Sequence, residues 1–311
     1  MSKVIFLRHG VRQVDIKEPT KPLSIKSDCV LQLAAGSNLN ITGYTYSLEV
    51  GKFIKRKIGI PDIIYADIST SRTIDTAIAL AQGSNNEFIS VVNDNNDPYF
   101  NPETKTTEES IKQSKEILKN NDKIIQSIKE KAEKILPCLT LEEKSYINKK
   151  NNAPLGLINQ EYTLSTTMLF AEVSGIKDPL LMKRNLIASI QPINWLASYP
   201  NRDTIKDAAK FLLGGVQYFL DNYKLSVIVG HHHNINMITQ YYKNSFQVPE
   251  FPEYWVPPNS GLIFTVYRDK INIEILYLNK NRFKIIPYME IDNIKECIEL
   301  KLIKKRVNYV K

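Results

Sequence analysis

All four histidines of the chain follow the two segments that most resemble buried strands. His9 stands in the sequence Arg8-His9-Gly10-Val11-Arg12, directly after the apolar residues 4–7. The other three, His231, His232 and His233, follow a glycine at the end of the apolar residues 225–229. In open α/β sheets, ligands bind at the carboxyl ends of the strands. An imidazole flanked by two guanidiniums favours an anion there, and phosphate is the first candidate.

A third arginine occurs at the start of an expected helix. Residues 63–66 are typical of a short strand, residues 67–73 of a polar turn, and residues 74–80 of a helix. Arg72 therefore lies near a helix N-terminus, where backbone N–H groups already favour an anion. Taken alone, Arg72 would more often only cap a surface turn. Together with Arg8 and Arg12, it is interpreted as a third phosphate contact.

The elements that must position these residues alternate between strand and helix. Residues 42–58 and 203–223 have the apolar spacing of helices, and residues 91–92 that of a short strand. Residues 13–41 are interpreted as a loop, and residues 290–311 as helical or loose. Three late segments, separated by short polar connections, predict antiparallel hairpins at one edge of the sheet: 262–267, 271–278 and 283–286. The fold class is therefore α/β, with a mostly parallel central sheet flanked by helices.

The composition changes near residue 100, which predicts an insertion in the sheet domain. Residues 103–150 are rich in Lys, Glu, Ile and Asn, Thr106 and Glu109 form a capping-box pattern, and a further helix is expected at 159–173. The expected organisation is an α/β catalytic domain formed by residues 1–100 and 201–311. A helical cap formed by residues 101–200 is inserted into it.

The composition excludes several classes of protein. The net charge of +8 comes from lysines spread along the chain, and no nucleic-acid-binding motif accompanies it, so no nucleic-acid partner is expected. No apolar run reaches the roughly 18 residues that span a membrane. The three cysteines, Cys29, Cys138 and Cys297, have no metal-ligand or redox-motif spacing. Three consecutive histidines on a strand would point to alternating sides, so they predict no shared metal ion.

The motifs together resemble the histidine phosphatase superfamily, in its acid-phosphatase branch with phytases and glucose-1-phosphatases. That family begins with RHGxRxP, continues with an SxxxRTxxTA-like segment and ends with GHDxN. The matching segments are Arg8-His9-Gly10-Val11-Arg12, Ser71-Arg72-Thr73 with Thr76-Ala77, and Gly230-His231-His232-His233-Asn234-Ile235. Lesser similarities occur at 42–43, 97–102 and 258–262. The resemblance extends over essentially the whole chain, is weakest across the insertion, and implies a phosphoglycerate-mutase-like fold.

The resemblance also implies roles for the site residues. His9 would be the nucleophile that attacks phosphorus and forms a phosphohistidine. Arg8, Arg12 and Arg72 would neutralise the phosphate oxygens, and His231 would complete the pocket as a catalytic residue and a phosphate contact. No metal or cofactor would be required. The expected activity is that of a histidine-type acid phosphatase acting on a phosphorylated small molecule.

Two positions depart from the family pattern. Val14 replaces a proline that only stiffens the loop. His232 replaces the aspartate that protonates the leaving oxygen. A protonated histidine can donate, with a reference pKa of about 6.5 against about 3.9 for Asp, but nearby arginines favour the neutral imidazole. Either His232 donates, or an acid of the insertion does, or only good leaving groups are accepted.

These departures leave a second interpretation, a catalytically weak or inactive phosphate-binding pseudophosphatase. A phosphoglycerate-type mutase is a third, and the order of segments favours the acid-phosphatase branch over it. Neither the substrate nor the oligomeric state can be inferred from these residues. Because the first strand begins almost at the N-terminus, no signal peptide is expected, which agrees with a cytoplasmic protein. The resemblance equally allows a periplasmic or secreted one.

Overall fold

The computed structural model describes residues 1–10, 39, 41–67, 71–86, 89–92, 108–124, 126–127, 192–193, 195–196, 199, 201–242, 248, 254–279, 282–292, 294 and 306–307. In this part of the chain the helices are α1 (Ile41–Lys57), α2 (Ser71–Ser84), α3 (Glu108–Asn120), α8 (Arg202–Asn222) and α9 (His232–Tyr241). The strands are β1 (Lys3–Arg8), β2 (Ile63–Asp67), β3 (Ile89–Val92), β4 (Leu225–Gly230), β5 (Gly261–Tyr267), β6 (Lys270–Asn279), β7 (Arg282–Ile291) and β8 (Arg306–Val307).

These strands form a single sheet in the order β7-β6-β5-β1-β4-β2-β3-β8. The central strands β1, β4, β2 and β3 are parallel, as the sequence predicted. Strands β5, β6 and β7 add an antiparallel meander on one side, where hairpins were expected. On the other side β8 pairs antiparallel with β3, although residues 290–311 were expected to be helical or loose. The backbone N–H and C=O groups on the outer side of β3 can pair with a short strand, which explains β8. With antiparallel pairs on both sides of the parallel centre, the sheet as a whole is mixed.

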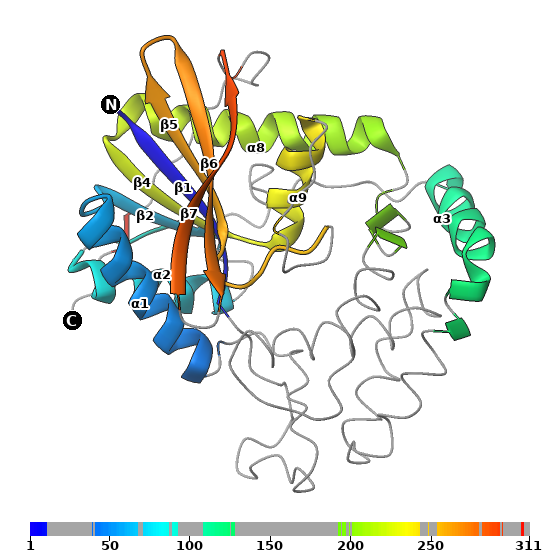
Figure 1. Cartoon of the computed structure of the whole chain (residues 1–311), viewed down its shortest axis with the longest axis horizontal. Helices are drawn as coiled ribbons and strands as arrows, with labels where there is room; N and C mark the ends of the chain where they lie inside the picture. Colours follow the sequence, from blue (N-terminus) through cyan, green and yellow to red (C-terminus); the bar gives the residue numbers. More distant parts are fainter. Residues whose placement is uncertain are drawn as a thin grey trace, which may run out of the picture.

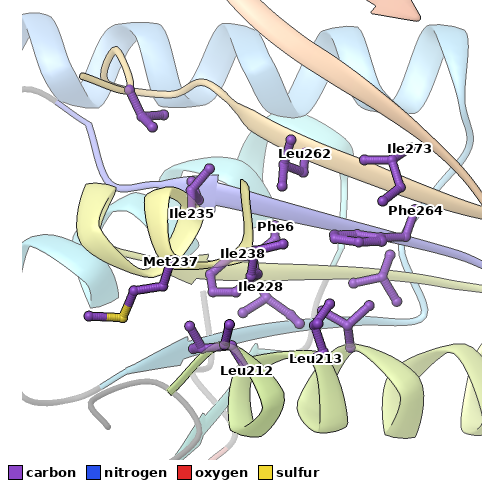
Figure 2. Close-up of a cluster of buried hydrophobic side chains, with 14 of the residues drawn as sticks. Phe6, Leu212, Leu213, Ile228, Ile235, Met237, Ile238, Leu262, Phe264 and Ile273 are labelled. Carbon is purple, nitrogen blue, oxygen red and sulfur yellow. The ribbon is translucent and has the colours of Figure 1, made fainter. Parts of the chain in front are cut away.

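Helices cover both faces of this sheet and explain the uninterrupted apolar run of β1. Val4 and Phe6 contribute to a core cluster that includes the buried faces of α8 and α9. Ile5 and Leu7 contribute to a second cluster with α1 and α2. Figure 1 shows these helix pairs on opposite sides of the sheet, and Figure 2 shows the α8 and α9 side chains packed toward the strands. A strand buried on both faces needs apolar residues at every position.

The predicted insertion is described only in part. Helix α3 begins at Glu108, next to the expected capping box, and Figure 1 shows it apart from the sheet. The helix expected at 159–173 and the loop expected at 13–41 lie almost wholly outside the described residues. The boundaries at residues 100 and 200 therefore stay a prediction. Among the described residues, no helix is long and apolar enough to cross a membrane.

Helices α1 and α2 approach each other through two glycines. A Cβ atom on Gly83 would lie 2.0 Å from the carbonyl oxygen of Leu48, and one on Gly51 would lie 2.3 Å from that of Leu80. Neither distance is possible for real atoms, and both obstacles are backbone. The two helices can therefore reach this separation only with glycine at both positions.

This contact predicts that Gly83→Ala destabilises the protein. In an exposed helix the same substitution would stabilise by up to about 1 kcal/mol. Here α1 and α2 must separate, and we expect a loss of about 1–3 kcal/mol in the free energy of unfolding, measured by urea denaturation. The control is Lys55→Ala on the exposed face of α1, which should change stability by less than about 0.5 kcal/mol. A more stable Gly83→Ala protein would contradict the close packing.

Candidate active site

The turn that follows β1 is held on three sides by hydrogen bonds of its main chain. The backbone N–H of His9 donates to the carbonyl oxygen of Gly230 at the end of β4, at 2.9 Å. The N–H of Arg8 donates to the carbonyl of Ser260, at 2.9 Å. The N–H of Gly10 donates to Thr76 Oγ1 in α2, at 2.9 Å. The sheet and α2 together therefore fix the backbone that carries His9.

Gly10 is required by the space around it. A Cβ atom there would lie 2.8 Å from Ser47 Oγ and 2.9 Å from the carbonyl oxygen of Gly43, both in α1. Ser47 is fully buried, so it has little room to move. Glycine is thus needed at this position for the close approach of α1 to the end of β1.

The ring of His9 is oriented by a hydrogen bond at each nitrogen. Nδ1 lies 2.7 Å from the carbonyl oxygen of Gly10, and Arg72 Nε donates to Nε2 at 3.2 Å. A carbonyl can only accept and a guanidinium can only donate, so these partners assign the proton to Nδ1 and a lone pair to Nε2. The side chain is only 2% exposed. His9 is therefore held as a neutral imidazole with an unprotonated nitrogen beside Arg72.

Arg72 lies in the first turn of α2, because this helix begins at Ser71 and not at residue 74 as expected. Thr76 Oγ1 donates a hydrogen bond to the carbonyl oxygen of Arg72 at 2.7 Å. Thr76 Oγ1 also accepts the hydrogen bond from the Gly10 N–H. One fully buried hydroxyl group therefore links the start of α2 to the turn after β1. An anion next to His9 Nε2 would meet the Arg72 guanidinium near the N-terminal end of a helix.

The second histidine motif lies at the junction of β4 and α9. His231 is the N-cap residue of α9 and is 6% exposed, and its ring centroid lies 5.3 Å from that of His9. The backbone N–H of His231 donates to Asn234 Oδ1 at 2.8 Å, which fixes the start of the helix. His231 and His9 are thus brought together by the parallel pairing of β1 with β4.

The geometry of the His triplet differs from the expected one. His232 and His233 begin α9 instead of continuing a strand, so the argument from strand alternation does not apply to them. His233 stacks on His231 with ring centroids 5.2 Å apart and an interplanar angle of 8°. His232 contacts His233 edge-on. Within the described residues, no three His, Cys, Asp or Glu side chains are grouped so that they could hold a metal ion.

Arg8 is buried beneath the segment that precedes β5. Its side chain is 2% exposed, its Nη1 donates to the carbonyl oxygen of Val256, and its Cζ lies 5.2 Å from the ring centroid of Trp255. The sequence indicated this segment only through its similarity at 258–262, and no pattern pointed to Trp255. Thr76 was recognised as part of a motif, but its role as the link between two elements was missed.

The structure thus brings Arg8, His9, Arg72 and His231 together at the carboxyl ends of the central strands β1 and β4. His232 lies in the first turn of α9, with a partly exposed side chain. Arg12 and Val14 lie outside the described residues. Around His9, the arrangement supplies an unprotonated ring nitrogen, one neighbouring guanidinium and a second imidazole. These groups suit a nucleophile that acts on a bound anion.

We expect Thr76→Val to loosen this site. Valine keeps the shape of the side chain but removes the acceptor of the Gly10 N–H. A buried N–H without a partner costs about 1–3 kcal/mol of stability. Thr76→Ser is the matched control because it keeps the hydroxyl and loses one methyl group. Thermal or urea unfolding of the two variants should place serine nearer to the wild type, and the reverse order would contradict the assigned bond.

Comparisons with known proteins return similarity of fold only. No protein-family model and no curated protein sequence matches the chain. The phytase of Klebsiella sp. ASR1 superposes with a TM-score of 0.61 at 16% identity, over 89% of this chain and 82% of the phytase. The phytase of Citrobacter braakii gives a TM-score of 0.62 at 17% identity, over 89% and 85%. The phytase of D. castellii gives 0.51 at 11% identity, over 92% and 73%. The chain has the fold of these phytases, in agreement with the resemblance to the histidine phosphatase superfamily.

Proposed function

We propose that this protein is a phosphomonoester hydrolase that acts through a covalent phosphohistidine on His9. The observation that carries the proposal is the pair of hydrogen bonds on the His9 ring, which leave the Nε2 lone pair beside Arg72. The order of the three motifs and the fold shared with phytases support the same activity. Its substrate is a phosphorylated small molecule.

In the first step, His9 Nε2 attacks phosphorus and the bond from phosphorus to the ester oxygen breaks. The Nδ1–H bond to the Gly10 carbonyl stabilises the positive charge that develops on the ring. Arg8, Arg12 and Arg72 neutralise the non-bridging oxygens, with His231 as a further donor. In the second step, water attacks phosphorus and gives a proton to the group that protonated the leaving oxygen, the bond from nitrogen to phosphorus breaks, and phosphate leaves. This reaction scheme uses no metal or other cofactor.

The leaving oxygen needs a proton in the first step, and His232 is the proposed donor. Its position at the start of α9 makes this role demanding, because the positive end of a helix favours the neutral imidazole. The same observation favours a second candidate function, a phosphate-binding protein with weak catalysis. We further propose that residues 101–200 form a helical cap that contributes to substrate choice, within a catalytic domain formed by residues 1–100 and 201–311.

Replacement of His9 tests the nucleophile. His9→Ala removes the attacking nitrogen, so hydrolysis of p-nitrophenyl phosphate should fall by at least about a thousandfold. The control is Lys270→Ala on an exposed part of β6, which should retain full activity. Circular dichroism would establish that both variants are folded. A folded His9→Ala protein with the wild-type rate would overturn the proposal.

Replacement of His232 separates the two candidate functions. If His232 donates the proton, His232→Ala should lower turnover of an alkyl phosphate by about 10²–10⁴-fold. Turnover of p-nitrophenyl phosphate should fall much less, because its leaving group needs little protonation. Equal losses for both substrates would argue against a donor role. An inactive wild type whose His232→Asp variant gains alkyl phosphatase activity would instead support the weakly catalytic binding protein.

A further inference from the structure

The guanidinium of Arg8 is held in an aromatic environment that no motif predicted. Trp255 is fully buried, and the Arg8 guanidinium carbon lies 5.2 Å from its ring centroid. A cation at this distance from the face of an indole is attracted by the negative charge of the ring face, most strongly where water is excluded. The carbonyl of Val256, the next residue, accepts a hydrogen bond from Arg8 Nη1. Two neighbouring residues thus fix the orientation of one buried arginine.

Main-chain and aromatic contacts anchor the segment that carries Trp255. The N–H of Asn259 donates to the carbonyl oxygen of Arg8 at 3.1 Å. Asn236 Nδ2, from α9, donates to the carbonyl oxygen of Tyr254 at 2.6 Å. The ring of Tyr254 stacks on Trp195, with centroids 5.7 Å apart and an interplanar angle of 6°. Trp255 therefore cannot move away from Arg8 without breaking contacts to β1, α9 and the chain before α8.

The aromatic contacts also connect this part of the site to the end of the expected insertion. Trp195 is 4% exposed and lies just before α8, close to the predicted boundary at residue 200. It packs on Tyr199 as well as on Tyr254. Ring packing therefore connects the segment entering α8 to Tyr254, and the next residue along the chain, Trp255, contacts the Arg8 guanidinium.

We propose that Trp255 is a positioning residue for Arg8 and that phosphate binding to Arg8 changes the environment of the Trp255 ring. The inference rests on the proposed function only in taking Arg8 as a phosphate contact. An unrestrained arginine loses side-chain freedom when it binds an anion, whereas Arg8 is already ordered by the indole and the carbonyl. Trp195 and Tyr254 act one step further away, because they hold the segment that carries Trp255.

Substitution of Trp255 tests the positioning role through affinity for inorganic phosphate. Trp255→Leu removes the ring face, and the dissociation constant of phosphate should rise by about five- to thirtyfold. Trp255→Phe keeps an aromatic face and should recover part of this loss. Phe219→Leu is the matched control. Phe219 is a buried aromatic residue of α8 that packs on Tyr65, and the substitution also replaces its ring with a leucine side chain. It should lower the melting temperature while phosphate affinity stays unchanged.

The chain allows a direct optical test because Trp195 and Trp255 are its only tryptophans. In Trp195→Phe, all indole emission comes from Trp255, and titration with inorganic phosphate should change it. In Trp255→Phe, emission comes from Trp195 alone, and the change should be much smaller.

The outcomes separate this inference from the proposed hydrolase. If phosphate binding depends on Trp255 but the protein hydrolyses no phosphate ester, the inference is supported and the proposed hydrolase activity is excluded. Hydrolysis with phosphate affinity equal in the wild type and Trp255→Leu would overturn the inference alone. A parallel loss of affinity in Phe219→Leu would overturn it too, since it would show a general effect of destabilisation. A wild type that binds no phosphate would overturn both.

Discussion

The hydrogen bond between His9 Nδ1 and the carbonyl of Gly10 is the interaction on which the candidate site depends. It decides which ring nitrogen carries the proton and therefore which one faces Arg72. The bond joins adjacent residues, so it exists only if the turn after β1 has one particular shape. That shape is held by bonds to Gly230, Ser260 and Thr76. The chemistry of one imidazole thus rests on the main chain of a buried turn.

The sheet supplies the rigidity that this turn needs. β1 lies between β4 and β5 and is apolar on both faces, with α8 and α9 packed on one side and α1 and α2 on the other. Its parallel neighbour β4 delivers His231, and its antiparallel neighbour β5 follows the segment that orders Arg8. The proposed nucleophile and its partners therefore come from elements that are adjacent in space but distant in sequence.

Much of this arrangement could be predicted from the sequence, because strand runs and helix periodicity are local signals. The apolar runs before His9 and His231 predicted β1 and β4, and Arg72 was expected near the N-terminus of α2, although this helix begins at Ser71 and not at residue 74. Three features could not be predicted. The His triplet begins a helix, the contact of Arg8 with Trp255 joins residues far apart in sequence, and β8 depends on the edge of β3. The last two depend on tertiary packing that the local pattern does not encode. The start of α9 is fixed by the local bond from the His231 N–H to Asn234 and was missed because the triplet was interpreted as part of a strand.

The most direct test of the proposed function is to find where phosphate is bound covalently during turnover. The protein would be quenched in alkali during hydrolysis of p-nitrophenyl phosphate, since phosphohistidine survives base and not acid, and its peptides analysed by mass spectrometry and phosphorus NMR. The account predicts one phosphoryl group, on the peptide that contains His9 and bonded to Nε2. Phosphate on another residue would contradict it. So would rapid hydrolysis without any phosphorylated enzyme under conditions in which breakdown of the intermediate limits the rate.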